Sequence, residues 1–211
     1  MNAAGQSPLE WATRERRAAR QGVRRRVTAW LGLNPAARRA DALTARVAHG
    51  VVGEKETARL LAGLPKGWRV VYGRKLPPYP NDYDALLIPP GGTAVVAADT
   101  KNWHAGWETT VRGGRLHCGR QDRHEQVEKA VGVPGVRVWP LLVVHGSRIV
   151  PPPPLPPGRL EVGAAGWEGV VHVLGPQWLV PVLAGASRGR DPGRAAALAR
   201  RVDGVLSARP V

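Results

Sequence analysis

The sequence has a single cysteine, Cys118, no phenylalanine, and about half as many acidic as basic residues. One cysteine excludes an intrachain disulfide framework. No apolar run approaches the length of a membrane span, and the first residues lack the apolar core and the cleavage site of a signal peptide. The sequence therefore predicts a cytoplasmic protein with no membrane association.

The shortage of acidic residues leaves a large positive charge. Lys and Arg number 31 against 16 Asp and Glu, a formal net charge of +15. Such a field attracts polyanions, of which nucleic acid is the commonest that a soluble protein meets. A GC-rich genome would explain Arg in place of Lys, but it does not explain the excess of cations over anions. Nucleic acid is the expected partner; the oligomeric state stays open.

Residues 1–50 differ from the rest and are predicted to form a basic helical arm. Apolar residues spaced between positions 9 and 31 favour a first helix. A second helix is expected from Pro35 to about His49, with Asn34 as its N-cap, because proline is favoured at the first helical position. Gly50 is expected to interrupt this helix.

Charge suggests what the arm does. Residues 1–47 contain ten arginines and three acidic residues, a net charge of +7, so we expect the arm to add affinity for nucleic acid rather than chemistry. A solvated, partly disordered extension is the alternative. A membrane-surface helix is disfavoured because Arg16 and Arg20 interrupt its thin apolar face.

Beyond the arm, helical and strand patterns alternate, which predicts an α/β fold: a central mixed sheet flanked by helices. The core is expected to span residues 51–185, followed by a basic C-terminal helix within 186–211. The predicted helices are Glu54–Leu64, Gln121–Val131, Gln177–Leu183 and Gly193–Leu206. The predicted strands are Trp68–Arg74, Asp84–Ile88, Ala94–Lys101, a hairpin over Trp107–Cys118, Val136–Val144 and Val170–Leu174.

Two neighbouring strands place charged residues at one end of an apolar sheet. Side chains alternate along a strand, so Asp99 and Lys101 share a face at the end of Ala94–Lys101. Asp84 opens the preceding strand. If the two strands pair through the turn at Pro89–Gly92, Asp84 lies opposite the end that carries Asp99 and Lys101.

This arrangement has a chemical use. Converging carboxylates repel each other and favour a hard cation such as Mg²⁺ or Mn²⁺ between them. A lysine beside them can position or deprotonate an attacking water and attract a phosphate. Glu54 would add a carboxylate if its helix packs near this end. The plain alternative is an ordinary surface salt bridge, since Asp-x-Lys is common by chance.

Other residue patterns give weaker evidence for a functional site. His117 and Cys118 are adjacent and point to opposite faces of a strand, so they cannot readily share a zinc ion, and His104 and His124 add no recognisable ligand spacing. Tryptophans close to Lys101 could stack on bases or pack over the sheet edge. The proline run at 151–157 predicts an extended surface loop.

The order of these motifs resembles the nuclease-related domain (NERD) family of the PD-(D/E)xK superfamily. That family opens with a Gly-Glu helix, continues with Asp-x-Asp before an apolar strand, then has a strand ending in acid-x-Lys-Asn, and later a helix bearing Gln. The corresponding segments here are Gly53–Glu54, Asp82–Tyr83–Asp84, Asp99–Thr100–Lys101–Asn102, and Gln126. The resemblance covers about Gly53 to Leu183 and implies a restriction-endonuclease-like core.

The resemblance also implies roles for individual residues. Asp84 and Asp99 would be metal ligands, with the Thr100 carbonyl as a third. Lys101 would be the catalytic lysine, and Glu54 an acid that orients the metal or water. The remaining implied site residue is Gln126, as a supporting group.

Two departures affect the details of the site. The acid before x-Lys is Asp99, where the family more often has Glu. Asp84 is followed by Ala85, where the family usually has His. Whether Asp82 or Asp84 is the first metal ligand also stays open.

The sequence thus predicts a Mg²⁺- or Mn²⁺-dependent nuclease that hydrolyses phosphodiester bonds, with DNA as the expected substrate. The alternative is a catalytically inactive nucleic-acid-binding module on the same fold. The residue pattern does not decide between DNA and RNA, or between cleavage at ends and within a strand.

Overall fold

The computed structural model describes residues 6–21, 35–75, 82–130, 137–186, 189–205 and 207–208. Within these ranges no helix is both long enough and apolar enough to cross a membrane. The helices are α1 (Gln6–Ala19), α3 (Pro35–Leu61), α4 (His124–Ala130), α5 (Pro176–Ala186) and α6 (Pro192–Val205). The strands are β1 (Arg69–Lys75), β2 (Asp82–Ile88), β3 (Val95–Asn102), β4 (Glu108–Arg112), β5 (Arg115–Cys118), β6 (Gln121–Asp122), β7 (Val138–His145), β8 (Arg148–Ile149), β9 (Arg159–Gly163), β10 (Val170–Leu174) and β11 (Ser207–Ala208).

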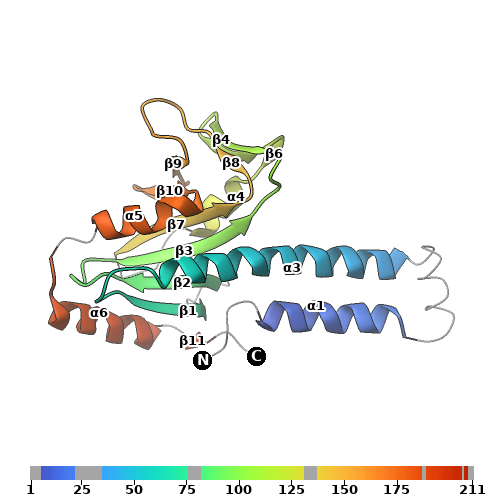
Figure 1. The fold of residues 1–211 in the computed structure, drawn as a ribbon, viewed down its shortest axis with the longest axis horizontal. Coiled ribbons are helices and arrows are strands. Elements are labelled where there is room, and N and C mark those ends of the chain that lie inside the picture. Colours follow the sequence, from blue (N-terminus) through green and yellow to red (C-terminus); the bar gives the residue numbers. More distant parts are fainter. Residues whose placement is uncertain are drawn as a thin grey trace.

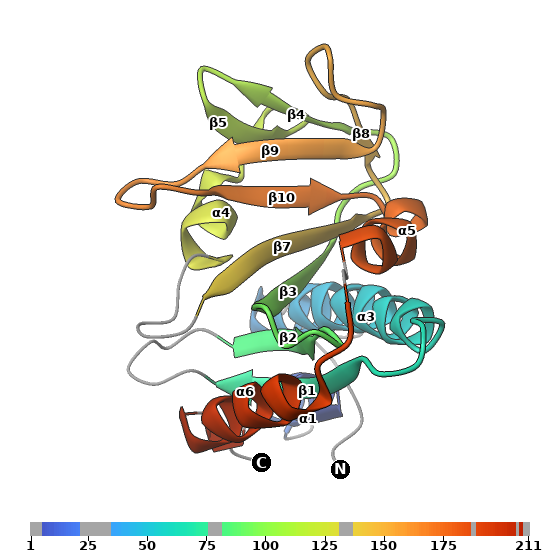
Figure 2. The ribbon, with the colours of Figure 1, turned by 90° about the vertical axis from the view of Figure 1, so that its left-hand side faces the viewer.

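A mixed sheet forms the centre of the molecule, in the order β11-β1-β2-β3-β7-β10-β9. Strands β1, β2 and β3 are antiparallel, whereas β7 is parallel to both β3 and β10. A smaller sheet, β6-β5-β4-β8, includes the predicted hairpin. Helices cover both faces of the central sheet (Figure 2), so the predicted α/β architecture is confirmed.

The position of β7 in the sheet explains why its sequence is an almost unbroken apolar run. Leu141 and Val143 pack in the core cluster that includes α3 and α5. Leu142 and Val144 lie on the opposite face, in the cluster that includes α4 and β5. Because both faces are covered, alternation with polar residues is lost, and the strand predicted over Val136–Val144 is confirmed.

The long helix α3 corrects one expectation. It continues through Gly50 to Leu61 instead of stopping at Gly50, because packing of its second half outweighs the cost of about 1 kcal/mol for an internal glycine. Gly53 contributes to that packing. A Cβ atom there would lie 3.1 Å from the Asn102 Cβ and 3.3 Å from the Thr100 Cγ2, so glycine lets α3 approach β3 closely.

In the described residues of the arm, α1 lies beside the first half of α3 (Figure 1). Asp41 on α3 forms ion pairs with Arg16 of α1 and with Arg20, which directly follows α1, both at 2.7 Å. The Thr44 hydroxyl also reaches the carbonyl of Ala12, at 3.3 Å. The predicted boundary after residue 50 falls inside α3, so one helix joins the arm to the core.

Several predicted element ends shift. The helix predicted from Gln121 begins at His124 instead, because Gln121 and Asp122 pair with β5 and the Asp122 carboxylate accepts the His124 N–H at 2.8 Å. Its predicted end at Val131 lies outside the described residues, as does the predicted first helix beyond residue 21. Strand β9 follows the proline run and was not predicted.

Gly92 provides a sharp test of the packing between the turn after β2 and α6. Its φ is +59°, and a Cβ would lie 2.5 Å from the backbone nitrogen of Ala195. We expect Gly92→Ala to lower the free energy of unfolding by more than the roughly 1–3 kcal/mol that left-handed backbone strain alone costs. Gly113→Ala is the control: its φ is +55° with nothing within 4 Å. Equal losses of unfolding free energy for the two variants, measured in urea melts, would contradict the predicted steric clash.

Candidate functional site

Strands β2 and β3 bring the first two predicted acids together. Their register pairs Ala85 with Ala98, so the next position along each strand is Asp84 and Asp99. The Thr100 backbone N–H donates a hydrogen bond of 2.6 Å to the Asp84 Oδ2. The Asp84 carboxylate is therefore fixed against the end of β3 rather than free at the start of its own strand.

Asp99 and Lys101 form an ion pair on one face of β3. The Lys101 Nζ lies 2.7 Å from the Asp99 Oδ2, and the side chains are only 24% and 15% exposed, respectively. Solvent screens a pair this enclosed less than it screens the surface pairs elsewhere on the molecule. An ordinary surface salt bridge does not account for such burial.

Electrostatics tie Asp84 to three other predicted site residues. Burial raises the pKa of Asp84 well above its ordinary value, and the nearby charges of Asp99 and Glu54 raise it further. The Thr100 N–H and the Lys101 ammonium act in the opposite direction. Mutual repulsion among converging acids is an arrangement that a nearby cation would relieve.

The acids nevertheless do not form a closed metal cage. Among the described residues, no group of three or more His, Cys, Asp or Glu side chains lies close enough together to hold a metal ion. This leaves Asp84 and Asp99 as a pair, with Glu54 acting on Asp84 through its charge.

Gln126 is the predicted residue that stands apart. It lies on α4, a helix that contacts both β3 and β7. Its side-chain amide donates to Glu125 at 3.0 Å. No hydrogen bond joins it to Asp84, Asp99 or Lys101 among the described residues, so its supporting role stays a prediction.

A buried chain of polar side chains was missed by sequence reasoning. The Thr100 hydroxyl donates to the Thr57 hydroxyl at 3.1 Å, and Thr57 lies 2.8 Å from the His145 Nε2. Burial lowers the pKa of His145, which favours the neutral ring. The chain joins β3, α3 and β7 immediately behind Asp99 and Lys101. The only signal for it was Thr57, three residues after Glu54 on the same helix.

The tryptophans near Lys101 separate into two environments. Trp103 is partly buried against the core, with the Arg123 guanidinium 5.9 Å from its ring centre, so it packs. Trp107 is 37% exposed and lies against the His104 ring, with centroids 5.4 Å apart. Packing explains Trp103, while Trp107 stays partly exposed beside His104.

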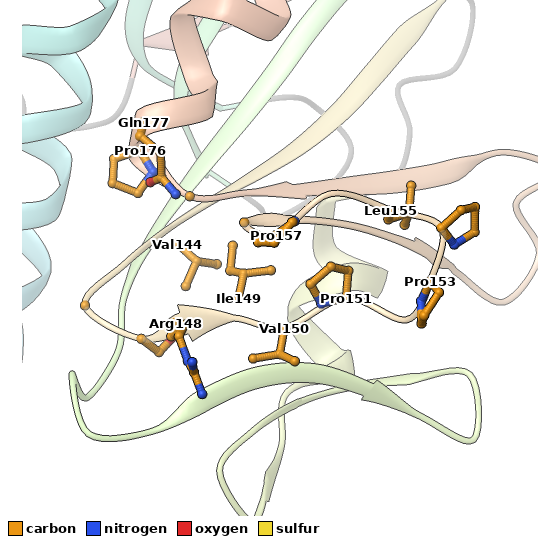
Figure 3. A pocket seen from close by; sticks show the side chains of 15 residues that line it. Val144, Arg148, Ile149, Val150, Pro151, Pro153, Leu155, Pro157, Pro176 and Gln177 are labelled. Atoms are coloured by element: carbon orange, nitrogen blue, oxygen red, sulfur yellow. The ribbon is translucent and has the colours of Figure 1, made fainter.

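A separate groove lies between the proline run and the start of α5. Its volume is about 650 Å³, and Figure 3 shows Ile149, Pro151, Leu155 and Pro157 lining it. Arg148 is the charged residue on its wall, and none of the predicted site residues reaches it. The acids on β2 and β3 therefore remain the better candidate for chemistry, although the groove is more concave.

Comparison with known families adds an independent observation to this geometry. Residues 49–133 match the family model of NERD, the nuclease-related domain. The resemblance inferred from the motifs is confirmed over these residues, within the PD-(D/E)xK context of that family. No curated protein and no solved structure gave a significant match.

The matched segment begins in the middle of α3 and extends past α4. It includes Glu54, Asp84, Asp99, Lys101 and Gln126. The N-terminal half of α3, with its arginines, lies outside the match. A nuclease-related function is thus supported for the part of the chain that carries the candidate site.

Proposed function

We propose that this protein is a divalent-metal-dependent nuclease that hydrolyses phosphodiester bonds in DNA. The observation that carries the proposal is the convergence of Asp84, Asp99 and Lys101 at adjoining ends of β2 and β3, inside the nuclease-related domain. The net charge of +15 gives the protein an electrostatic attraction to its substrate.

The donor set fits Mg²⁺ or Mn²⁺. Both are hard cations that take oxygen ligands, and Mg²⁺ is commonly held by only one or two carboxylates together with water and substrate phosphate. Asp84 and Asp99 would supply the carboxylates, and the Thr100 carbonyl a further oxygen. Glu54 would act on the metal or its water from α3. A bound divalent ion would lower the pKa of water and neutralise charge on the phosphate.

Lys101 would bind the scissile phosphate. Its Nζ forms an ion pair with the Asp99 carboxylate at 2.7 Å. A charged ammonium has three donors and no acceptor, so it can hold a phosphate oxygen and orient a water molecule. Asp99 would orient Lys101 as well as contribute a ligand.

Incubation with supercoiled plasmid, linear DNA and RNA, with Mg²⁺, Mn²⁺ or EDTA, tests the proposal. Cutting of DNA that needs the metal and stops in EDTA is the expected result. Binding without cutting under every condition would favour the inactive binding module instead. Preferential cutting of RNA would support the proposed phosphodiester hydrolysis but with RNA, instead of DNA, as the substrate.

Thr57→Val tests the buried polar chain. It removes the hydroxyl that joins Thr100 to His145 while keeping the shape of the side chain. We expect kcat to fall about 10-fold, as for groups that support a metal site from behind, with little change in KM. Thr44→Val is the control, since its hydroxyl bonds to the carbonyls of Ala40 and Ala12 in the arm and not to residues of the candidate site. Equal effects on kcat would remove Thr57 from the site.

A further inference from the structure

The face of α3 that packs on the candidate site continues past the end of the sheet. Positions 39, 43, 46, 50, 53 and 57 are separated alternately by four and three residues, so they form one stripe along a helix. At one end of the stripe, Gly53 and Thr57 lie buried against β3. At the other end, Arg39 and Arg46 are exposed.

The half of α3 that projects beyond the sheet begins beside the end of β3. The Asn102 side chain, at the last position of β3, donates to the His49 carbonyl on α3 at 2.8 Å. Figure 1 shows the N-terminal half of α3 projecting beyond the sheet, with α1 beside it. Because α3 is continuous, the position of its arginines relative to Lys101 is set by helix geometry rather than by a linker.

The exposed half of the stripe has the composition of a phosphate-binding surface. Arg38, Arg39 and Arg46 line one hollow on α3. None of the three forms an ion pair with an acidic residue in the part of the chain that is described. By contrast, Arg16 on α1 and Arg20 directly after it are paired with Asp41. Arginine's fork of donors matches phosphate oxygens, which suits this surface to a polyanion.

We propose that the Arg39–Arg46 stripe of α3 holds the phosphate backbone of the DNA on one side of the candidate cleavage site. The inference rests on the proposed function for the position of the cut. At a rise of 1.5 Å per residue, Arg46 and Arg39 lie about 10 and 21 Å along α3 from Gly53. With one phosphate per 3.4 Å along each strand, this is about three and six base pairs of duplex.

The double variant Arg39→Gln/Arg46→Gln tests this stripe. Affinity is measured in EDTA, so that nothing is cut, for blunt duplexes from about 6 to 24 base pairs over a range of salt concentrations. The parent should gain affinity with length. The variant should bind long duplexes about 10-fold or more weakly, lower the salt slope by about 2, and change little on the shortest duplexes.

Two further variants distinguish a specific binding surface on α3 from a general effect of the protein's positive charge. Arg200→Gln/Arg201→Gln removes the same charge from exposed positions of α6 and should leave the length dependence intact. Arg39→Lys/Arg46→Lys should restore most of the lost affinity. Equal losses from both glutamine pairs at every length, or no loss from the α3 pair, would overturn the inference. Failure of the plasmid assay alone would reject the nuclease and leave this binding result standing.

Discussion

Lys101→Ala should lower the rate of DNA cleavage by about 10²–10⁴-fold while divalent-metal binding is retained, because a positioned charged or proton-transferring group typically contributes that much to catalysis. The substitution leaves Asp84 and Asp99 in place and removes only the ammonium that pairs with Asp99. Single-turnover cleavage of labelled DNA measures the rate, and calorimetry with Mn²⁺ measures metal binding.

Two comparisons make the Lys101 result specific. Lys55→Ala removes the same charge from an exposed position of α3 and should cleave at the parental rate. Asp99→Asn should also be inactive, but for another reason, since it removes charge from the metal site and should weaken Mn²⁺ binding. Metal-dependent cutting that survives both Lys101→Ala and Asp99→Asn would show that the site lies elsewhere.

Asp84→Asn should abolish activity and, at neutral pH, stabilise the metal-free protein. Burial and the charges of Asp99 and Glu54 raise the pKa of Asp84. A raised pKa means that the ionised carboxylate lowers the stability of the fold. The favourable contribution of the protonated carboxyl group is complete below the ordinary pKa of an aspartate and is lost as pH rises through the pKa of the folded state. Asparagine stays uncharged and can still accept the Thr100 N–H.

The expected result is therefore opposite shifts in two measurements. In EDTA, the melting temperature of Asp84→Asn should exceed the parent's at pH 7, and the gap should close as pH falls. With Mg²⁺, the cleavage rate should drop by about 10²-fold or more, as for loss of a main electrostatic group. Asp203→Asn, which removes an exposed acid paired with Arg69, should change neither greatly. A less stable, active Asp84→Asn would contradict both assignments.

Local patterns alone were sufficient to predict much of the architecture. A strand repeats every two residues, so the sequence of β3 was enough to place Asp99 and Lys101 on one face, and their ion pair agrees. The unbroken apolar run of β7 required a strand covered on both sides, as its two core clusters show. The match over residues 49–133 covers the short motifs whose order is visible in the chain.

The tertiary structure decided what depends on residues distant in sequence. Thr57 and His145 are 88 residues apart, and no local period predicts their hydrogen bond. The contact between Asp84 and the Thr100 N–H needed the strand register, which local patterning leaves free to slip. The continuation of α3 through Gly50 depended on packing against β3, since propensity for a single glycine is a weak term that burial overrides.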